Sequence, residues 1–329
     1  MNTKMNKIKL AFGVALAFGL TGAAYADTIK FDPDGTAGGY GAVDLNAMDP
    51  LPGNALAVSA VPLSGGAAFT TYFQSEISQL LTNGGNIALP TGAAGPFELT
   101  LSGALNEVVS NAIDTTGDGV PDIVTFDHTG GTISIYYDDF SGGTINADGT
   151  TGNSGLGYAD GKLILQATVN PQLLGATYTL QNADLDGDGV LEPVIEPLDQ
   201  FGNDDLGVDT LVGSGSTSLT AVVDFFDPEF FLSPPEVISL AFDGTLTDPF
   251  DSVNPEQVVA GQVPDYGPDN INGLSNGIDN GAVQDYHFEI DGNISYKKAA
   301  VPEPGSLALL GLGMLGLAGM KRRNGSFAG

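Results

Sequence analysis

The chain of 329 residues contains no cysteine. Disulfide bonds therefore cannot stabilise its fold, and no metal site can use thiolate ligands. Histidine is nearly as scarce, with only His128 and His287. We expect both at the surface, His128 beside a Gly-rich turn and His287 on the polar face of a strand. Two isolated histidines and no cysteine give little support for zinc binding or for an enzyme, and we predict no catalytic residues.

Basic residues are also scarce. Ten Lys and Arg stand against 40 Asp and Glu, for a formal net charge of −30. Six of the ten basic residues but only one acidic residue, Glu303, lie in the first 26 or last 29 positions. Residues 27–300 therefore carry 39 acidic and four basic side chains, a net charge of about −35. Such a surface repels nucleic acid and attracts divalent cations, so we expect no nucleic-acid partner.

The C-terminal apolar segment is too short for a firm membrane anchor. Leu307–Met320 is a run of 14 uncharged residues, which as a helix would span ~21 Å against the ~30 Å core of a bilayer. A Pro-Glu-Pro element precedes the run and a basic cluster follows it. By the positive-inside rule the basic end stays cytoplasmic, which places the preceding chain outside. The defining residues of this tail are Val301, Pro302, Glu303, Pro304, Lys321, Arg322 and Arg323.

This tail resembles the PEP-CTERM sorting signal. The resemblance covers residues 301–323, where a Pro-Glu-Pro element, an apolar run and a basic cluster follow one another at the C-terminus. It implies recognition by an exosortase-type processing enzyme of the inner membrane, with transient membrane contact through the apolar segment. It also implies export to the cell surface or extracellular matrix of a Gram-negative bacterium that makes extracellular polysaccharide.

The N-terminus predicts a secretory signal peptide. Lys4, Lys7 and Lys9 precede an apolar run, and Ala24-Tyr25-Ala26 supplies a small-x-small cleavage pattern. Cleavage between Ala26 and Asp27 is expected. The predicted organisation is a signal peptide (1–26), an exported acidic β domain (27–296), a linker (297–304), a sorting segment (305–323) and a short tail (324–329).

Apolar and polar residues alternate in several segments, which predicts strands with one buried face. The expected strands are Tyr286–Lys297, Leu163–Val169, Leu219–Phe225, Phe97–Val109 and Val237–Leu246, with a hairpin formed by Ile123–Phe126 and Thr132–Tyr137 around Thr129-Gly130-Gly131. Many short strands with Gly, Pro and Asn turns favour an all-β fold, an antiparallel β-sandwich of jelly-roll type.

Three segments depart from this pattern. Phe69, Phe73, Ile77, Leu80 and Leu81 recur at helical spacing, which predicts one short helix. Residues 27–66 and 248–284 are rich in Gly, Pro and Asn and are expected to form long surface loops.

Two acidic segments, 114–122 and 184–192, share the pattern Asp-x-[Thr/Asp]-Gly-Asp-Gly-Val-x-[Asp/Glu]. Calcium prefers several oxygen ligands in a tightly turned loop, and acids at alternate positions with a Gly at the turn supply this. The expected ligands are Asp184, Asp186, Asp188, the Val190 carbonyl and Glu192 in one loop, and Asp114, Thr116, Asp118, the Val120 carbonyl and Asp122 in the other. Neither loop has the Glu that closes an EF-hand, and the alternative is a tight solvated turn without an ion.

A second resemblance covers the exported region. The Gly202–Leu206 stretch and the Gln284–Asp291 strand resemble those of flocculation-associated PEP-CTERM proteins. The leading expectation is a non-enzymatic, calcium-stabilised surface or matrix protein that contributes to biofilm or floc formation with extracellular polysaccharide. The alternative is a secreted carbohydrate-active hydrolase that uses a pair of acidic residues.

Overall fold

The computed structural model describes residues 28–58, 65–90, 96–117, 119, 121–139, 157–159, 161–184, 192–196, 210–246 and 286–298. These ranges form an all-β, antiparallel structure, as predicted. They contain no helix with the length and apolar character needed to span a bilayer. The N-terminal 27 residues and the sorting segment lie outside them.

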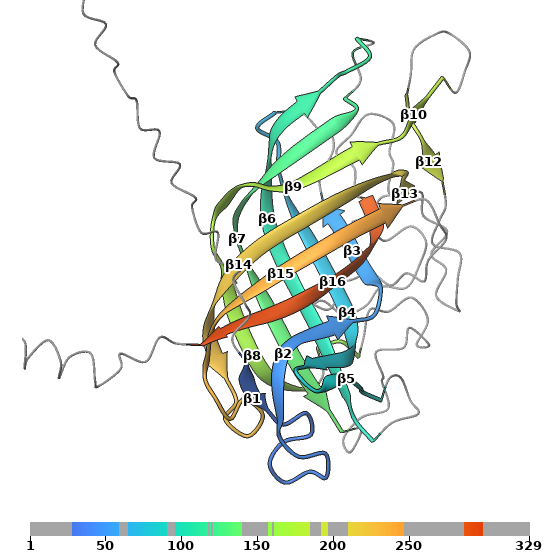
Figure 1. The fold of residues 1–329 in the computed structure, drawn as a ribbon. Helices are drawn as coiled ribbons and strands as arrows, with labels where there is room; N and C mark the ends of the chain where they lie inside the picture. The colour runs from blue at the N-terminus through green and yellow to red at the C-terminus, as the bar shows by residue number, and fades with distance from the viewer. Residues whose placement is uncertain are drawn as a thin grey trace, which may run out of the picture.

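Long strands build most of the molecule (Figure 1). They are β2 (Val43–Pro50), β3 (Gly53–Val58), β4 (Ala68–Thr82), β6 (Glu98–Ile113), β7 (Ile123–Asp138), β8 (Lys162–Val169), β9 (Gln172–Leu180), β14 (Gly213–Phe226), β15 (Pro235–Leu246) and β16 (Tyr286–Lys298). Short strands complete the set: β1 (Ile29–Phe31), β5 (Gly85–Ala88), β10 (Asn182–Ala183), β11 (Glu192–Pro193), β12 (Ile195–Glu196) and β13 (Thr210–Leu211).

The main sheet has twelve strands and closes on itself. Neighbours follow in the order β4, β6, β7, β8 with β9, β14, β15 and β16. The last strand then pairs with β2 through Ile294↔Met48 and with β3 through Phe288↔Ala55, and both of these strands pair with β4. If β2 and β3 are taken as one position and β8 and β9 as another, successive positions are neighbours all the way round. The described strands thus follow a meander, without the strand order of a jelly roll. The sequence did not indicate this order, because alternation of residues encodes a strand's buried face but not its partner.

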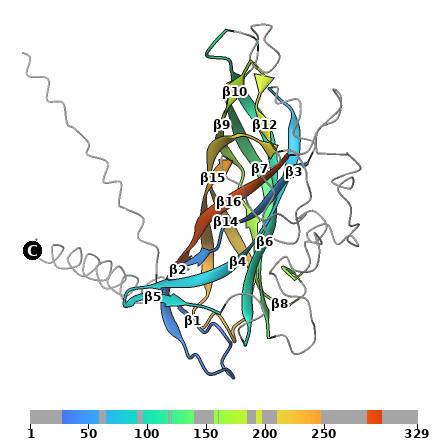
Figure 2. The ribbon, with the colours of Figure 1, turned by 90° about the vertical axis from the view of Figure 1, so that its right-hand side faces the viewer.

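Figure 2 shows the ribbon of the closed sheet from the side. Buried side chains from its opposite walls form one hydrophobic cluster and pack on one another as the two layers of a sandwich do. Phe73 on β4 meets Phe242 on β15 at a ring distance of 5.3 Å, although these strands are not hydrogen-bonded neighbours. Tyr296 on β16 is fully buried, and its hydroxyl donates to Met48 Sδ at 2.9 Å. A closed sheet with about eight strands around its circumference has an interior just wide enough to be filled by side chains.

The segment expected to be a helix is strand β4. Phe69, Phe73 and Ile77 are four residues apart, and a spacing of four fits the strand period of two as well as a helical turn. Thr71 and Ser75, between them, are buried on the same interior side. The pairing of β4 with β2 shifts by one residue opposite Asp49 and Pro50. Beyond this irregularity the other set of alternating residues faces the interior, so that Leu80 is buried as well. The helix prediction was therefore wrong.

The hairpin expected around Gly130-Gly131 is also absent, because β7 is one continuous strand of 16 residues. Both glycines have positive φ, 155° and 143°, and a Cβ on Gly131 would lie 2.3 Å from the Ala104 carbonyl oxygen. These glycines allow the strand to pass close to β6 where the pairing register shifts between Asn106 and Glu107.

Residues 27–66 are only partly loop, since β1, β2 and β3 lie within them. The other expected loop, 248–284, lies outside the described residues. The remaining expected strands are present as β6, β8, β14, β15 and β16. In β14 the alternation holds for Leu219 and Ala221, but a register shift before Phe225 leaves that ring 42% exposed.

Candidate functional site

The first predicted calcium loop connects β6 to β7 and is turned around the carboxylate of Asp114. Its Oδ1 accepts hydrogen bonds from the Gly117 N–H (2.5 Å) and the Thr116 hydroxyl (3.2 Å), and its Oδ2 accepts one from the Gly119 N–H (2.7 Å). Gly117 and Gly119 have φ values of +83° and +96°, which side chains rarely adopt. The loop is therefore already curled around its first acidic residue.

Asp122 closes the same loop. Its Oδ2 accepts hydrogen bonds from the hydroxyl and N–H of Thr115 and from the Thr116 N–H. These bonds, led by the Thr115 hydroxyl and N–H and joined by one from Asn182, hold the pKa of Asp122 below its ordinary value. Asp122 is thus held as an anion on the outside of the molecule.

Asn182 links the first predicted calcium loop to β10, the strand that precedes the second one. Its Nδ2 donates to Asp122 Oδ1 at 3.0 Å and to the Pro121 carbonyl at 3.2 Å. It also belongs to β10, whose pair Ala183↔Glu192 joins it to β11. Strand β10, which precedes the second predicted loop, therefore lies beside the first loop, at the top of Figure 1.

Sequence reasoning missed Asn182. Its Oδ1 is buried and has no hydrogen-bond partner. An amide oxygen is a calcium ligand, but nothing local marks this asparagine, because it comes near the first loop only through the pairing of the sheet.

Much of the predicted ligand set cannot be placed. Asp118, Val120, Asp186, Asp188 and Val190 lie outside the described residues, as does the side chain of Glu192. Asp184 is exposed, and Thr116 bonds within its own loop. Among the residues that the structure describes, no group of three or more His, Asp or Glu is placed to hold a metal. Calcium binding at these loops stays a prediction.

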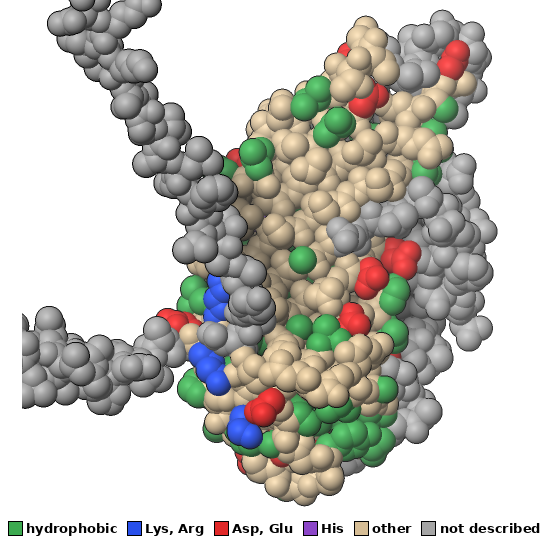
Figure 3. All heavy atoms as spheres, viewed as in Figure 1, with side chains coloured by type: hydrophobic (Ala, Val, Ile, Leu, Met, Phe, Trp, Pro, Cys, Tyr) green, Lys and Arg blue, Asp and Glu red, His purple; other side chains and the backbone are tan. Residues whose placement is uncertain are grey.

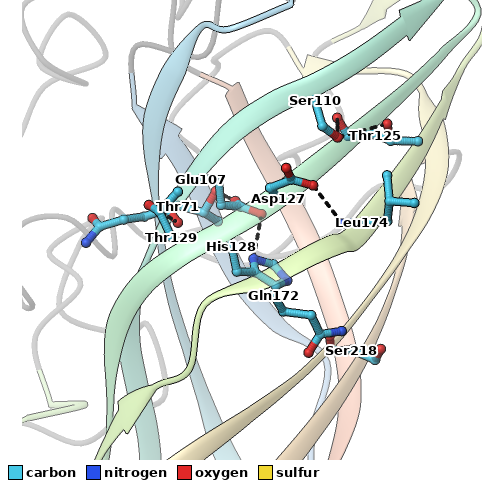
Figure 4. A network of polar contacts seen from close by, with 11 residues as sticks. Thr71, Glu107, Ser110, Thr125, Asp127, His128, Thr129, Gln172, Leu174 and Ser218 are labelled. Carbon is cyan, nitrogen blue, oxygen red and sulfur yellow. Dashed lines mark hydrogen bonds and ion pairs between the residues drawn. The ribbon is translucent and has the colours of Figure 1, made fainter.

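His128 is not at the surface, as the sequence suggested, but inside the closed sheet with 2% of its surface exposed (Figure 4). Its Nδ1 lies 3.3 Å from Glu107 Oε1, and the Thr71 hydroxyl donates to Glu107 Oε2. Glu107 and Thr71 are each 6% exposed. The ring makes no well-formed hydrogen bond through either nitrogen. The prediction failed because the glycines after His128 lie within a strand and not in a turn.

The imidazole of His128 packs on Gly175. A Cβ at position 175 would lie 2.1 Å from Cδ2 and 2.4 Å from Nε2 of the ring. Just before this glycine, Leu174 has a φ of 53° and its N–H donates to Asp127 Oδ1 at 2.7 Å. This cluster links β4, β6, β7 and β9 from within, and its burial suits a structural role.

Other predicted residues fall outside the description. His287 belongs to β16 and pairs with Leu56, but its side chain is not described. Ala26, Asp27 and the sorting residues, from Val301 to Pro304 and from Lys321 to Arg323, also lie outside. No role was predicted for Ser275, which stands in a Gly-x-Ser-x-Gly pattern at residues 273–277 and also lies outside the described residues. That pattern forms a nucleophile elbow when it connects a strand to a helix.

The comparisons with known proteins concern the C-terminus. No curated protein and no solved structure matches the chain. The family model for the PEP-CTERM protein-sorting motif matches residues 300–323, which include the Pro-Glu-Pro element and the basic cluster. The chain thus ends in a PEP-CTERM sorting motif, as an exported, surface-sorted substrate of an exosortase does.

Proposed function

We propose that this protein is a non-enzymatic component of the cell surface or extracellular matrix of a Gram-negative bacterium, where it contributes to floc or biofilm formation with extracellular polysaccharide. The observation that carries the proposal is the sorting motif at residues 300–323, joined to an exported region with a net charge of about −35. A protein addressed to the outside and strongly acidic is suited to bridging matrix components through divalent cations.

The distribution of charge supports this role. Of the described lysines, Lys30 lies 3.5 Å from Asp44, and Lys162 lies within 3 Å of both Asp227 and Glu229. On the face shown in Figure 3 the basic side chains gather at the lower left, whereas acidic side chains also appear at the top and the right-hand edge. Four lysines cannot neutralise the 39 acidic side chains of residues 27–300, so the exported region attracts cations from the medium.

Calcium at the two predicted loops is part of the proposal. Asp114 and Asp122 are held by their loop, and Asn182 places the strand that precedes the second acidic loop against the first loop. Extracellular calcium sites function with dissociation constants of roughly 10⁻⁴ to 10⁻³ M. Ions bound here would relieve repulsion between the loops and stabilise this end of the sheet.

A deletion strain tests the biological role. It is complemented with the wild-type gene, with a version truncated after residue 300, and with a loop variant carrying Asp→Asn at positions 114, 122, 184, 186 and 188. The wild type should restore cell aggregation, the truncated form should not, and the loop variant should aggregate less at low calcium. Normal flocs in the deletion strain would overturn the role.

The hydrolase alternative needs its own assay. The purified exported protein is incubated with the exopolysaccharide of the same strain, and newly formed reducing ends are measured. None should appear with the wild type. Release that persists in Ser275→Ala but disappears when an acidic pair is replaced would establish the hydrolase in place of the proposed role.

A further inference from the structure

The loop that follows β1 holds a second group of acidic side chains, far from the calcium loops proposed above. It begins at Asp32 and appears in blue at the bottom of Figure 1, and it packs on the turn after β14 through Asp32 N–H to Phe230 O (2.8 Å) and Thr36 N–H to Glu229 O (3.1 Å). Tyr40 of this loop contacts Phe97, at the start of β6. The calcium loop follows the other end of β6, and 16 extended residues span ~50 Å.

The loop is built around the carboxylate of Asp34. Its Oδ2 accepts hydrogen bonds from the N–H groups of Gly39 (2.5 Å) and Tyr40 (3.0 Å). A Cβ on Gly38 would lie 2.1 Å from the Asp34 carboxyl carbon, so the chain can approach this closely only with glycine. These contacts fix one carboxylate oxygen and leave Oδ1, which is buried and has no hydrogen-bond partner.

Asp32 supplies the second carboxylate. Only 6% of the residue is exposed, and its Oδ1 also is buried without a hydrogen-bond partner. Burial and the adjacent carboxyl group of Asp34 raise the pKa of Asp32, and the Asp34 N–H offsets part of that rise. Two neighbouring carboxyl groups thus each turn a bare oxygen into the protein.

No basic side chain of the described residues forms an ion pair with either acid. Lys162 is paired with Asp227 and Glu229, and Lys30 with Asp44. Buried carboxylate oxygens that lack a hydrogen-bond donor are costly when the acids also lack a counter-charge, and proteins resolve such pairs with a shared proton or a bound cation. The choice between the two depends on the medium, and extracellular fluid supplies calcium continuously.

We propose that Asp32 and Asp34 bind a calcium ion through their Oδ1 atoms, which fastens the start of the exported chain to the turn after β14. Calcium suits the site better than magnesium, because it accepts irregular geometry and completes its shell with backbone carbonyls and water. The site is separate from the loops at 114–122 and 184–192, and its occupancy does not depend on theirs.

Calcium titration calorimetry on the purified exported protein tests the site. Asp32→Asn combined with Asp34→Asn should bind one calcium ion fewer per chain than the wild type. Asp44→Asn, which removes the same charge from an exposed residue that pairs with Lys30, should keep the wild-type stoichiometry. A stoichiometry unchanged by the double substitution would overturn the proposal.

A second protein keeps the test decisive if the double variant does not fold. The loop variant with Asp→Asn at positions 114, 122, 184, 186 and 188 retains Asp32 and Asp34, and it should still bind one calcium ion at that pair. Terbium, used as a calcium probe, should give tyrosine-sensitised emission in this variant, and calcium should quench it. Absence of both signals from the folded loop variant would refute the site, whereas a wild-type stoichiometry in that variant would count only against the loop sites.

Discussion

Replacing Gly175 with alanine tests how tightly the buried His128 cluster is packed, and we expect it to destabilise the protein. The backbone at Gly175 does not have a positive φ, so alanine causes no backbone strain there. The added Cβ would meet the imidazole at 2.1 Å and must displace it. Overpacking of this kind costs about 1–3 kcal/mol, and moving the ring away from the buried Glu107 adds about 1–3 kcal/mol.

The expected loss of stability for Gly175→Ala is therefore about 2–6 kcal/mol. His128→Ala alone should cost about 2–4 kcal/mol, because it leaves a cavity and removes a polar neighbour of Glu107. In the double variant the new methyl group occupies space that the ring has vacated. We expect that variant to be about as stable as His128→Ala, so that the two changes are coupled by at least ~1.5 kcal/mol.

Urea unfolding, followed by circular dichroism, measures the four free energies of the cycle. Gly65→Ala is the control, because nothing lies within 4 Å of its added Cβ, and its effect should stay within about 0.5 kcal/mol. Free energies that add to within ~0.5 kcal/mol in the double variant would show that His128 does not pack on Gly175 and would refute the placement of the histidine.

Three further predictions follow from other contacts. Phe73→Ala should destabilise the protein by about 3–5 kcal/mol, because the ring is 1% exposed and packs on Phe242 across the interior; a loss below ~1 kcal/mol by urea unfolding would contradict this core. Lys162→Met should lower the free energy of unfolding by about 1 kcal/mol near neutral pH. Hydrogen bonds to Asp227 and Glu229 raise the pKa of Lys162, and the bond from Lys162 holds the pKa of Asp227 low despite the burial of that carboxylate. The difference in stability between wild type and variant should persist from pH 3.8, the ordinary pKa of Asp, to pH 10.5, the ordinary pKa of Lys. It should vanish as the pH falls through the lowered Asp227 pKa or rises through the raised Lys162 pKa, and unfolding at a series of pH values measures this. Asp122→Asn should speed amide hydrogen exchange at Thr115 and Thr116, because the Asp122 carboxylate accepts hydrogen bonds from both N–H groups. Unchanged exchange would contradict these hydrogen bonds.

The strands were predictable where one periodicity alone fitted the sequence. In β16, alternation placed Ile290, Ile294 and Tyr296 on one side, and all three are buried. The same reasoning failed at β4, because residues four apart share a face in a strand and in a helix alike. At His128 a pair of glycines was interpreted as a turn, although in the structure they permit close approach between β6 and β7.

The sequence by itself determined the sorting of this protein, its all-β class and the presence of two acidic segments. A sorting motif can be recognised in this way because its parts lie within 24 consecutive residues. Tertiary structure decided the rest. It closed the sheet by pairing β16 with β2 and β3 and buried His128 against Gly175. It also bonded Asn182 of β10 to the first loop and brought Asp32 against the turn at Phe230. Most of these contacts join residues far apart in the chain, and the register that makes them is set by the packing of the whole interior, for which no local pattern exists.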